Sequence, residues 1–171
     1  MRRKFLLSLA APLAAACGYR VGGKADLLPD TIHTIAIPAF GNITTRYKLS
    51  ERLPTAIGRE FINRTRYRVV YDPNEGDAIL TGSISNYMAA TSVIDQASGR
   101  AAGVQVIVFL NLRLTNKANG DIIFQRNNLE ARQRYEVSIE QAAYFDESEV
   151  ALERICREVA RQVVSTILEA F

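Results

Sequence analysis

The sequence has few of the residues that most often form catalytic and metal centres. It contains no tryptophan, one histidine (His33) and two cysteines (Cys17 and Cys156) among 171 residues. No Gly-x-Ser-x-Gly or other nucleophile motif accompanies His33, which argues against a serine or cysteine triad. We therefore expect neither an enzyme nor a bound metal or cofactor, and a surface or capping position for His33.

Long apolar runs are also lacking, except at the N-terminus. Arg2, Arg3 and Lys4 precede an apolar stretch and a run of alanines that ends at Cys17. This order is typical of a secretory signal peptide. No other segment approaches the roughly 20 apolar residues that a membrane-spanning helix needs. We expect residues 1–16 to be the signal peptide.

The cysteine at the end of this segment predicts lipid modification. Ala14, Ala15 and Ala16 fit a narrow peptidase site before Cys17. The Cys17 thiol is expected to receive a diacylglyceryl group, and its amino group an N-acyl group such as palmitate. The segment resembles the bacterial lipobox, with Ala14 where that pattern usually has leucine. Several acyl chains give a stable membrane anchor. In similar bacterial lipoproteins, an aspartate directly after the lipidated cysteine retains the protein in the inner membrane. Gly18 occupies that position here, which predicts the outer membrane. The alternative interpretation is a plain secretory signal peptide that is cut near Ala16, with no role for Cys17.

Loss of the signal peptide would also remove the excess positive charge. The full chain has 21 basic and 18 acidic residues, and three of the basic residues lie in the signal peptide. A mature chain without net charge gives no general reason to expect nucleic-acid binding. If Cys17 is acylated, Cys156 has no cysteine to pair with, and we expect it to be a small core residue.

The remaining sequence predicts a lipidated leader over residues 17–30 and a single domain over residues 31–171. Strands are expected over 34–40, 67–71, 77–88, 104–115 and the segment after Asn119-Gly120, with a small-residue loop over 89–103. A helix is expected over 48–64, which either begins near Pro54 or begins near Tyr47 and kinks. A second helix is expected to be capped by Asp146 and to run to Phe171. These elements predict an α/β two-layer sandwich: a mixed four- to five-stranded sheet with two helices on one face.

Asn119-Gly120 is a strong signal for a type I′ hairpin turn. With Ala118 opposite Asp121, the register places Leu110 opposite Leu129 and Val104 opposite Tyr135. Apolar residues of both strands then lie on the same face, as pairing requires.

Several segments resemble the lipopolysaccharide-assembly lipoprotein (LptE) family. They are Cys17-Gly-Tyr-Arg-Val21, Ile35-Ala-Ile-Pro38 followed by Asn42 and a helix, Asp77-Ala-Ile-Leu-Thr-Gly82, the long hairpin and the closing helix. The resemblance implies an outer-membrane lipoprotein within a large β-barrel translocon that helps to deliver lipopolysaccharide to the outer leaflet. The β-barrel protein and lipopolysaccharide are then the expected partners.

The hairpin suggests where such a ligand could bind. In the expected register, the face away from the helices carries Gln105, Ile107, Phe109 and Arg113, opposite Arg134, Arg132, Glu130 and Arg126. Arg113 and Arg126 would face each other, and a lipid phosphate would relieve their repulsion. Arg100, in the expected 89–103 loop, is a further candidate contact. The competing interpretation is that these arginines are solvated and discourage edge pairing.

Two functions from different classes are therefore expected from the sequence. The first is the translocon subunit, which predicts co-purification with a large outer-membrane β-barrel. The second is a lipoprotein regulator of a peptidoglycan synthase, which predicts capture of that enzyme instead. An enzyme acting on envelope glycans is a distant third, because the acidic cluster at Asp146, Glu147 and Glu149 is explained by helix capping.

Overall fold

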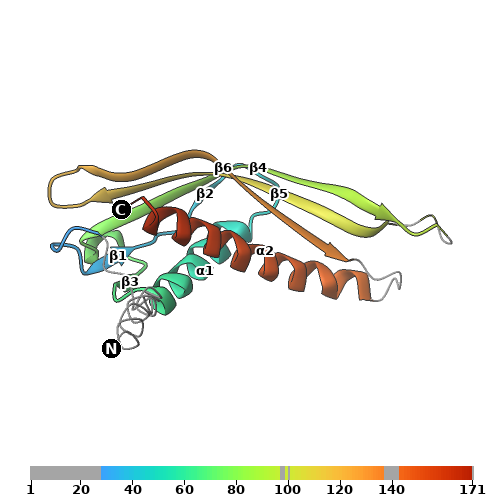
Figure 1. Cartoon of the computed structure of the whole chain (residues 1–171), viewed down its shortest axis with the longest axis horizontal. Coiled ribbons are helices and arrows are strands. Elements are labelled where there is room, and N and C mark those ends of the chain that lie inside the picture. The colour runs from blue at the N-terminus through green and yellow to red at the C-terminus, as the bar shows by residue number, and fades with distance from the viewer. Residues whose placement is uncertain (1–27, 97–98, 100, 137–142, 171) are drawn as a thin grey trace, which may run out of the picture.

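The fold is an α/β two-layer sandwich, as expected, but its sheet has six strands rather than the expected four or five, because the short β2 also pairs with β4. The computed structural model describes residues 28–96, 99, 101–136 and 143–170. Its helices, α1 and α2, lie on one face of a mixed six-stranded sheet, and the other face carries no described helix (Figure 1). The elements are β1 (Thr34–Ala36), β2 (Gly41–Asn42), α1 (Leu49–Arg64), β3 (Arg68–Val70), a short 3-10 helix η1 (Pro73–Glu75), β4 (Ala78–Ile94), β5 (Ala101–Asn116), β6 (Ile122–Glu136) and α2 (Ala143–Leu168).

The sheet has the order β3-β1-β4-β5-β6, and β2 also pairs with β4. The short strands β1, β2 and β3 form parallel pairs, whereas β4, β5 and β6 form long antiparallel pairs. β4 and β5 continue well beyond the point where β1 and β2 meet β4 (Figure 1). The expected loop over 89–103 is therefore wrong in its extent, because residues 89–94 belong to β4 and residues 101–103 belong to β5. Its small residues extend both strands, because each backbone supplies the other with hydrogen bonds that composition does not reveal.

Helix α1 begins at Leu49 and includes Pro54. Proline has no N–H, so the carbonyl four residues earlier, that of Ser50, loses its helical donor. The Phe40 N–H donates to this carbonyl at 2.9 Å, and the Ser50 hydroxyl donates to the Phe40 carbonyl in return. Pro54 is thus accommodated inside α1, and the freed carbonyl attaches the helix to the end of the segment that follows β1.

The expected apolar stripes of both helices form the core. Leu49, Leu53, Ile57 and Phe61 of α1 are completely buried. The stripe of α2 is buried too, and comprises Leu152, Ile155, Cys156, Val159, Val163 and Ile167. Helix α2 begins at Ala143 rather than at an Asp146 cap. Asp146 is instead the fourth residue of the helix.

The start of β1 is held by one carboxylate at the start of β4. Asp77 Oδ2 accepts hydrogen bonds from the backbone N–H groups of His33 at 3.0 Å and Thr34 at 2.8 Å. These bonds lower the pKa of the Asp77 carboxyl below its usual value. His33 itself is exposed. The Asp77 motif noted in the sequence therefore has a structural role, since it joins two neighbouring parallel strands.

None of the helices, in the parts of the chain that the structure describes, is both long and apolar enough to cross a membrane. Residues 1–27, which include Cys17 and most of the predicted leader, lie outside the described residues.

Candidate outer-face site

The candidate site is the sheet face opposite the helices, built by β4, β5 and β6. Along β5, Val106, Val108 and Leu110 are buried beneath the helices, whereas Ile107 and Phe109 are only partly buried. Because side chains alternate along a strand, Ile107 and Phe109 belong to the outer face. This division agrees with the sequence-based prediction.

Cross-strand pairing places an apolar centre between polar flanks. Ile107 lies between Met88 of β4 and Arg132 of β6, and Phe109 lies between Asn86 and Glu130. The next row joins Ala90, Gln105 and Arg134. The outer face at this end therefore presents Met88, Ile107 and Phe109, bordered on β6 by two arginines.

The expected register is correct at this end of the hairpin and wrong near its turn. Leu110 pairs with Leu129 and Val104 with Tyr135, as predicted, but Arg113 pairs with Gln125 and Arg126 lies opposite Leu112. Successive rows alternate faces, so Arg113 and Arg126 do not face each other. The proposed arginine fork around a phosphate is therefore excluded by the register.

The difference arises from the turn and from two bulges in β6. Asn116 N–H donates to the Asp121 carbonyl, so the loop has Lys117–Gly120 between its closing residues rather than a two-residue turn. Gly120 has φ 77°, and Asn119 does not share the positive φ that a type I′ turn requires. Asn side chains provide the turn bonds instead: Asn116 Oδ1 accepts from Ala118 N–H and Asn119 Oδ1 from Asp121 N–H.

Each bulge adds one residue to β6 and brings the register back to the predicted one. One interruption lies between the Leu114 and Thr115 pairs, and the other between the Leu110 and Leu112 pairs. At the second, Asn128 has φ 53° and its N–H donates to Asn111 Oδ1 at 2.9 Å. Asparagine tolerates this left-handed conformation better than most residues. The sequence signal that was missed is the pair Asn127-Asn128 inside an expected strand.

A shallow polar depression of about 280 Å³ lies at this bulge. It is lined by Thr81, Gly82, Ser83, Asn111, Leu112, Arg113 and Asn127. Asn111 Nδ2 donates to the Ser83 hydroxyl at 3.4 Å, and the Thr81 hydroxyl donates to the Arg113 carbonyl. Hydroxyl and amide groups thus line this depression together with Arg113, several rows along the strands from Ile107 and Phe109.

The arginines differ in their electrostatic surroundings. Arg132 Nε donates to Glu130 Oε1, and this bond raises the pKa of the Arg132 guanidinium. Within the described chain, Arg113, Arg126 and Arg134 have no carboxylate within ion-pair distance. Beside the apolar centre, Arg132 is therefore ion-paired, whereas Arg134 forms no such pair among the described residues. Arg100, the remaining candidate, lies outside the described residues.

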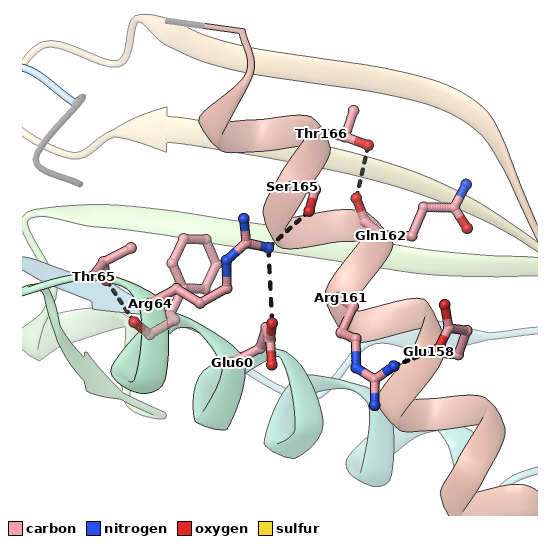
Figure 2. Close-up of polar contacts among 9 residues, drawn as sticks. Glu60, Arg64, Thr65, Glu158, Arg161, Gln162, Ser165 and Thr166 are labelled. Carbon is pink, nitrogen blue, oxygen red and sulfur yellow. Dashed lines mark hydrogen bonds and ion pairs between the residues drawn. The ribbon is translucent and has the colours of Figure 1, made fainter. Parts of the chain in front are cut away.

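Glu130 also connects the outer face to the helices. Gln162 of α2 donates through Nε2 to the Glu130 carbonyl at 3.0 Å. On the neighbouring turn, Ser165 accepts a 2.7 Å bond from Arg64 of α1, and the same guanidinium forms an ion pair with Glu60 (Figure 2). The polar contacts of α2 therefore join it to both β6 and α1.

A groove of about 840 Å³ runs between α1 and α2. Its lining contains the arginines Arg52, Arg59, Arg157 and Arg161, the glutamates Glu51, Glu60 and Glu153, and the small residues Ala56, Cys156 and Ala160 among others. Burial raises the pKa of the Cys156 thiol to about 11. Cys156 is thus a core residue, as expected, and its thiol is protonated and unreactive at neutral pH.

The described residues contain no group of three or more histidine, cysteine, aspartate or glutamate side chains able to hold a metal ion. The outer face offers arginine, hydroxyl, amide and apolar groups, which can bind an amphiphilic ligand or a protein surface.

The family comparison identifies the chain over nearly the whole described domain. A family model described as lipopolysaccharide-assembly, LptE, matches residues 32–167. No curated protein sequence matches the chain significantly.

Solved structures share the fold at low sequence identity. Rare lipoprotein B from Shewanella oneidensis is 14% identical, with a TM-score of 0.51 over 80% of this chain and 95% of that chain. A hypothetical protein from Chlamydia trachomatis is 11% identical, with a TM-score of 0.55 over 79% and 95% of the respective chains.

The dodecameric PelC from Paraburkholderia phytofirmans is 13% identical, with a TM-score of 0.53 over 78% and 87% of the two chains. Structural likeness at these identities establishes only the fold, which different assemblies can share. The match to the family model is the stronger finding, because it spans both helices and the sheet. On that match, the chain belongs to the lipopolysaccharide-assembly (LptE) family of non-enzymatic lipoproteins.

Proposed function

We propose that this lipoprotein is an outer-membrane subunit of the lipopolysaccharide translocon, anchored by acyl groups on Cys17 and docked with a large β-barrel protein. The family match over residues 32–167 is the observation that carries the proposal. In this role the subunit faces the periplasm and aids delivery of lipopolysaccharide to the outer leaflet.

The outer face supplies a second line of support. Ile107 and Phe109 form an apolar centre on a sheet face without a described helix, and Arg132 and Arg134 border it. Lipopolysaccharide combines acyl chains with phosphates, and arginine binds phosphate oxygens through two parallel hydrogen bonds. We assign the glycolipid contact to this end of the face, and not to an Arg113–Arg126 fork.

Depletion of the protein tests the proposed role. We expect the β-barrel translocon to lose its mature form and surface lipopolysaccharide to fall. An unchanged amount of surface lipopolysaccharide would contradict the role. Capture of a peptidoglycan synthase in place of the β-barrel would favour the envelope-regulator alternative.

The anchor is tested separately by mass spectrometry of the mature N-terminus. We expect diacylglyceryl and N-acyl groups on Cys17, and release of a Cys17→Ser variant from the membrane. An unmodified Cys17 in wild-type protein would remove the proposed anchoring.

The glycolipid contact is tested by exchange of Arg132 and Arg134 for glutamine. We expect binding to purified lipopolysaccharide to weaken about tenfold or more, which corresponds to at least about 1.4 kcal/mol. Arg154→Gln, at an exposed position of α2, is the matched control and should bind as wild type does. Unchanged affinity of the double variant would exclude this contact and leave the translocon role intact.

A further inference from the structure

One half of β4 has an open edge. On the side away from β5, β4 pairs with β1 at Ala78–Ile79 and with β2 at Ser83–Ile84. Beyond Ile84, no strand among the described residues pairs on that side. Asn86–Thr91 nevertheless forms an uninterrupted ladder with β5 on the other side. This segment is a regular strand with one row of unused backbone donors and acceptors.

The open edge has no charged side chain. From Asn86 to Ile94 every residue is uncharged, and all except Tyr87 are exposed. The opposite edge of the sheet, β6, is different, because it carries charged residues (Arg126, Glu130, Arg132, Arg134 and Glu136) and two bulges. Charges and bulges are the usual protection of a strand edge against pairing. β6 is thus protected against pairing, and Asn86–Thr91 is not.

Exposed apolar side chains gather at both ends of this segment. Ile43 follows β2 directly, donates its N–H to the Ile84 carbonyl, and is 84% exposed. Tyr47 is 74% exposed, and its neighbour Arg46 stacks over the Tyr87 ring at 5.4 Å. Val93 and Ile94 are exposed at the other end. Exposed apolar side chains therefore flank the open edge at both ends.

The hydrogen-bonding groups of the open edge determine which class of partner can bind there. Backbone donors and acceptors at strand spacing are satisfied by another extended polypeptide, whereas acyl chains offer no hydrogen-bonding groups. The regular part is short, and bulges beyond Thr91 interrupt it. Such a pairing is small beside the ~1,200–2,000 Å² of a stable interface, so it suits a partner that other contacts already hold in place.

We propose that Asn86–Thr91 accepts an extended, uncharged segment of the β-barrel partner as an added strand. Apolar side chains of that segment contact Ile43 and Tyr47 at one end and Val93 and Ile94 at the other. This inference rests on the proposed function, which supplies the partner.

The test compares charged substitutions on the two edges. Ala89→Lys together with Thr91→Lys adds two charges at exposed positions of the open edge and leaves Met88 and Ala90 of the outer face unchanged. Gln125→Lys together with Asn127→Lys adds the same charges at exposed positions of β6. We expect the first pair to reduce β-barrel recovered with the full-length lipoprotein about tenfold and the second pair to leave it unchanged, with equal melting temperatures for both.

Hydrogen exchange on the wild-type protein measures the pairing itself. We expect the free-edge amides within Asn86–Thr91 to exchange quickly in the isolated protein and at least tenfold more slowly in the complex with the β-barrel. Equal recovery of the β-barrel by both double variants, or no slowing in the complex, would overturn the edge pairing while the translocon role stands.

Slow exchange without the partner would also overturn the proposal. If the slow exchange depended on protein concentration, the edge would pair with a second copy of the chain. If it did not, residues 17–27 of the same chain would be the pairing segment. Failure of wild-type protein to recover any β-barrel would instead contradict the proposed function.

Discussion

At the scale of single residues, the fold depends on a few close contacts that connect distant segments. Gly82 of β4 lies directly against the Phe40 ring: a Cβ built at this position would lie 2.5 Å from Phe40 Cε2. Phe40 in turn exchanges hydrogen bonds with Ser50 of α1. The glycine of the Asp77–Gly82 motif therefore makes room for an aromatic ring beneath β4.

Gly82→Ala should lower the free energy of unfolding by about 1–3 kcal/mol, the usual cost of an overpacked core. Urea denaturation measures the change. Gly41→Ala is the matched control, because its nearest contact would be an ordinary 3.6 Å. The double variant Gly82→Ala, Phe40→Leu should recover part of the loss; no recovery would show that Phe40 is not the cause.

Asp77→Asn should make stability less dependent on acid pH. Because the folded-state pKa of Asp77 is lowered by the His33 and Thr34 N–H groups, its carboxylate stabilises the fold fully above the unfolded-chain pKa of about 3.9. This contribution is lost as the pH falls through the lowered folded-state pKa. The variant should be less stable than wild type at pH 7, and the difference should shrink below about pH 4 in urea titrations. Asp30→Asn, the same substitution at another exposed aspartate, is the matched control.

At the scale of elements, β6 shows why alternation alone does not fix a hairpin. The turn is longer than Asn119-Gly120 predicts, and the two bulges compensate for it. At the end of the hairpin far from the turn, the apolar faces of β5 and β6 match only because the two bulges in β6 compensate for the longer turn. Asn128, with φ 53°, is the residue on which the second bulge depends.

Substitutions at Asn128 should separate backbone strain from side-chain loss. Asn128→Val should cost about 1–2 kcal/mol, because a β-branched residue disfavours the left-handed conformation. Asn128→Gly should stay close to wild type, since glycine adopts positive φ freely. Chemical denaturation checks both values. Equal stability of the valine and glycine variants would contradict a required positive φ.

At the scale of the whole molecule, the core extends to the residue at which the described chain begins. Leu28 is 5% exposed, and its N–H donates to the Tyr67 hydroxyl at 2.9 Å. The expected domain boundary at residue 31 follows from composition. Composition does not show that a single apolar residue before this boundary, Leu28, packs against the domain.

A chain that begins at residue 28 should therefore be more stable than a chain that begins at residue 31, and an unlipidated chain that begins at residue 17 is the reference. A chain that begins at residue 31 should lose about 1.5–3 kcal/mol, the value of one buried leucine side chain. Thermal and urea unfolding of the three chains would measure these differences. Equal stability of all three would contradict a structural role for Leu28.

The sequence by itself determined the features that depend on local periodicity. The helix stripes at Leu49–Phe61 and Leu152–Ile167 and the inner face of β5 are encoded by the spacing of apolar residues, which has the same meaning in any context. The order of motifs was also enough to indicate the family, which the family model over residues 32–167 confirms.

Only the tertiary structure decided features that depend on residues distant in sequence. The length of β4 and β5, the bulges that separate Arg113 from Arg126, and the Phe40–Ser50 bonds around Pro54 all arise from pairing between segments. The open edge at Asn86–Thr91 also depends on distant residues, because β4 is unpaired on that side only where β1 and β2 have ended. Backbone hydrogen bonds carry no side-chain signature, so composition and periodicity cannot reveal where a partner strand stops.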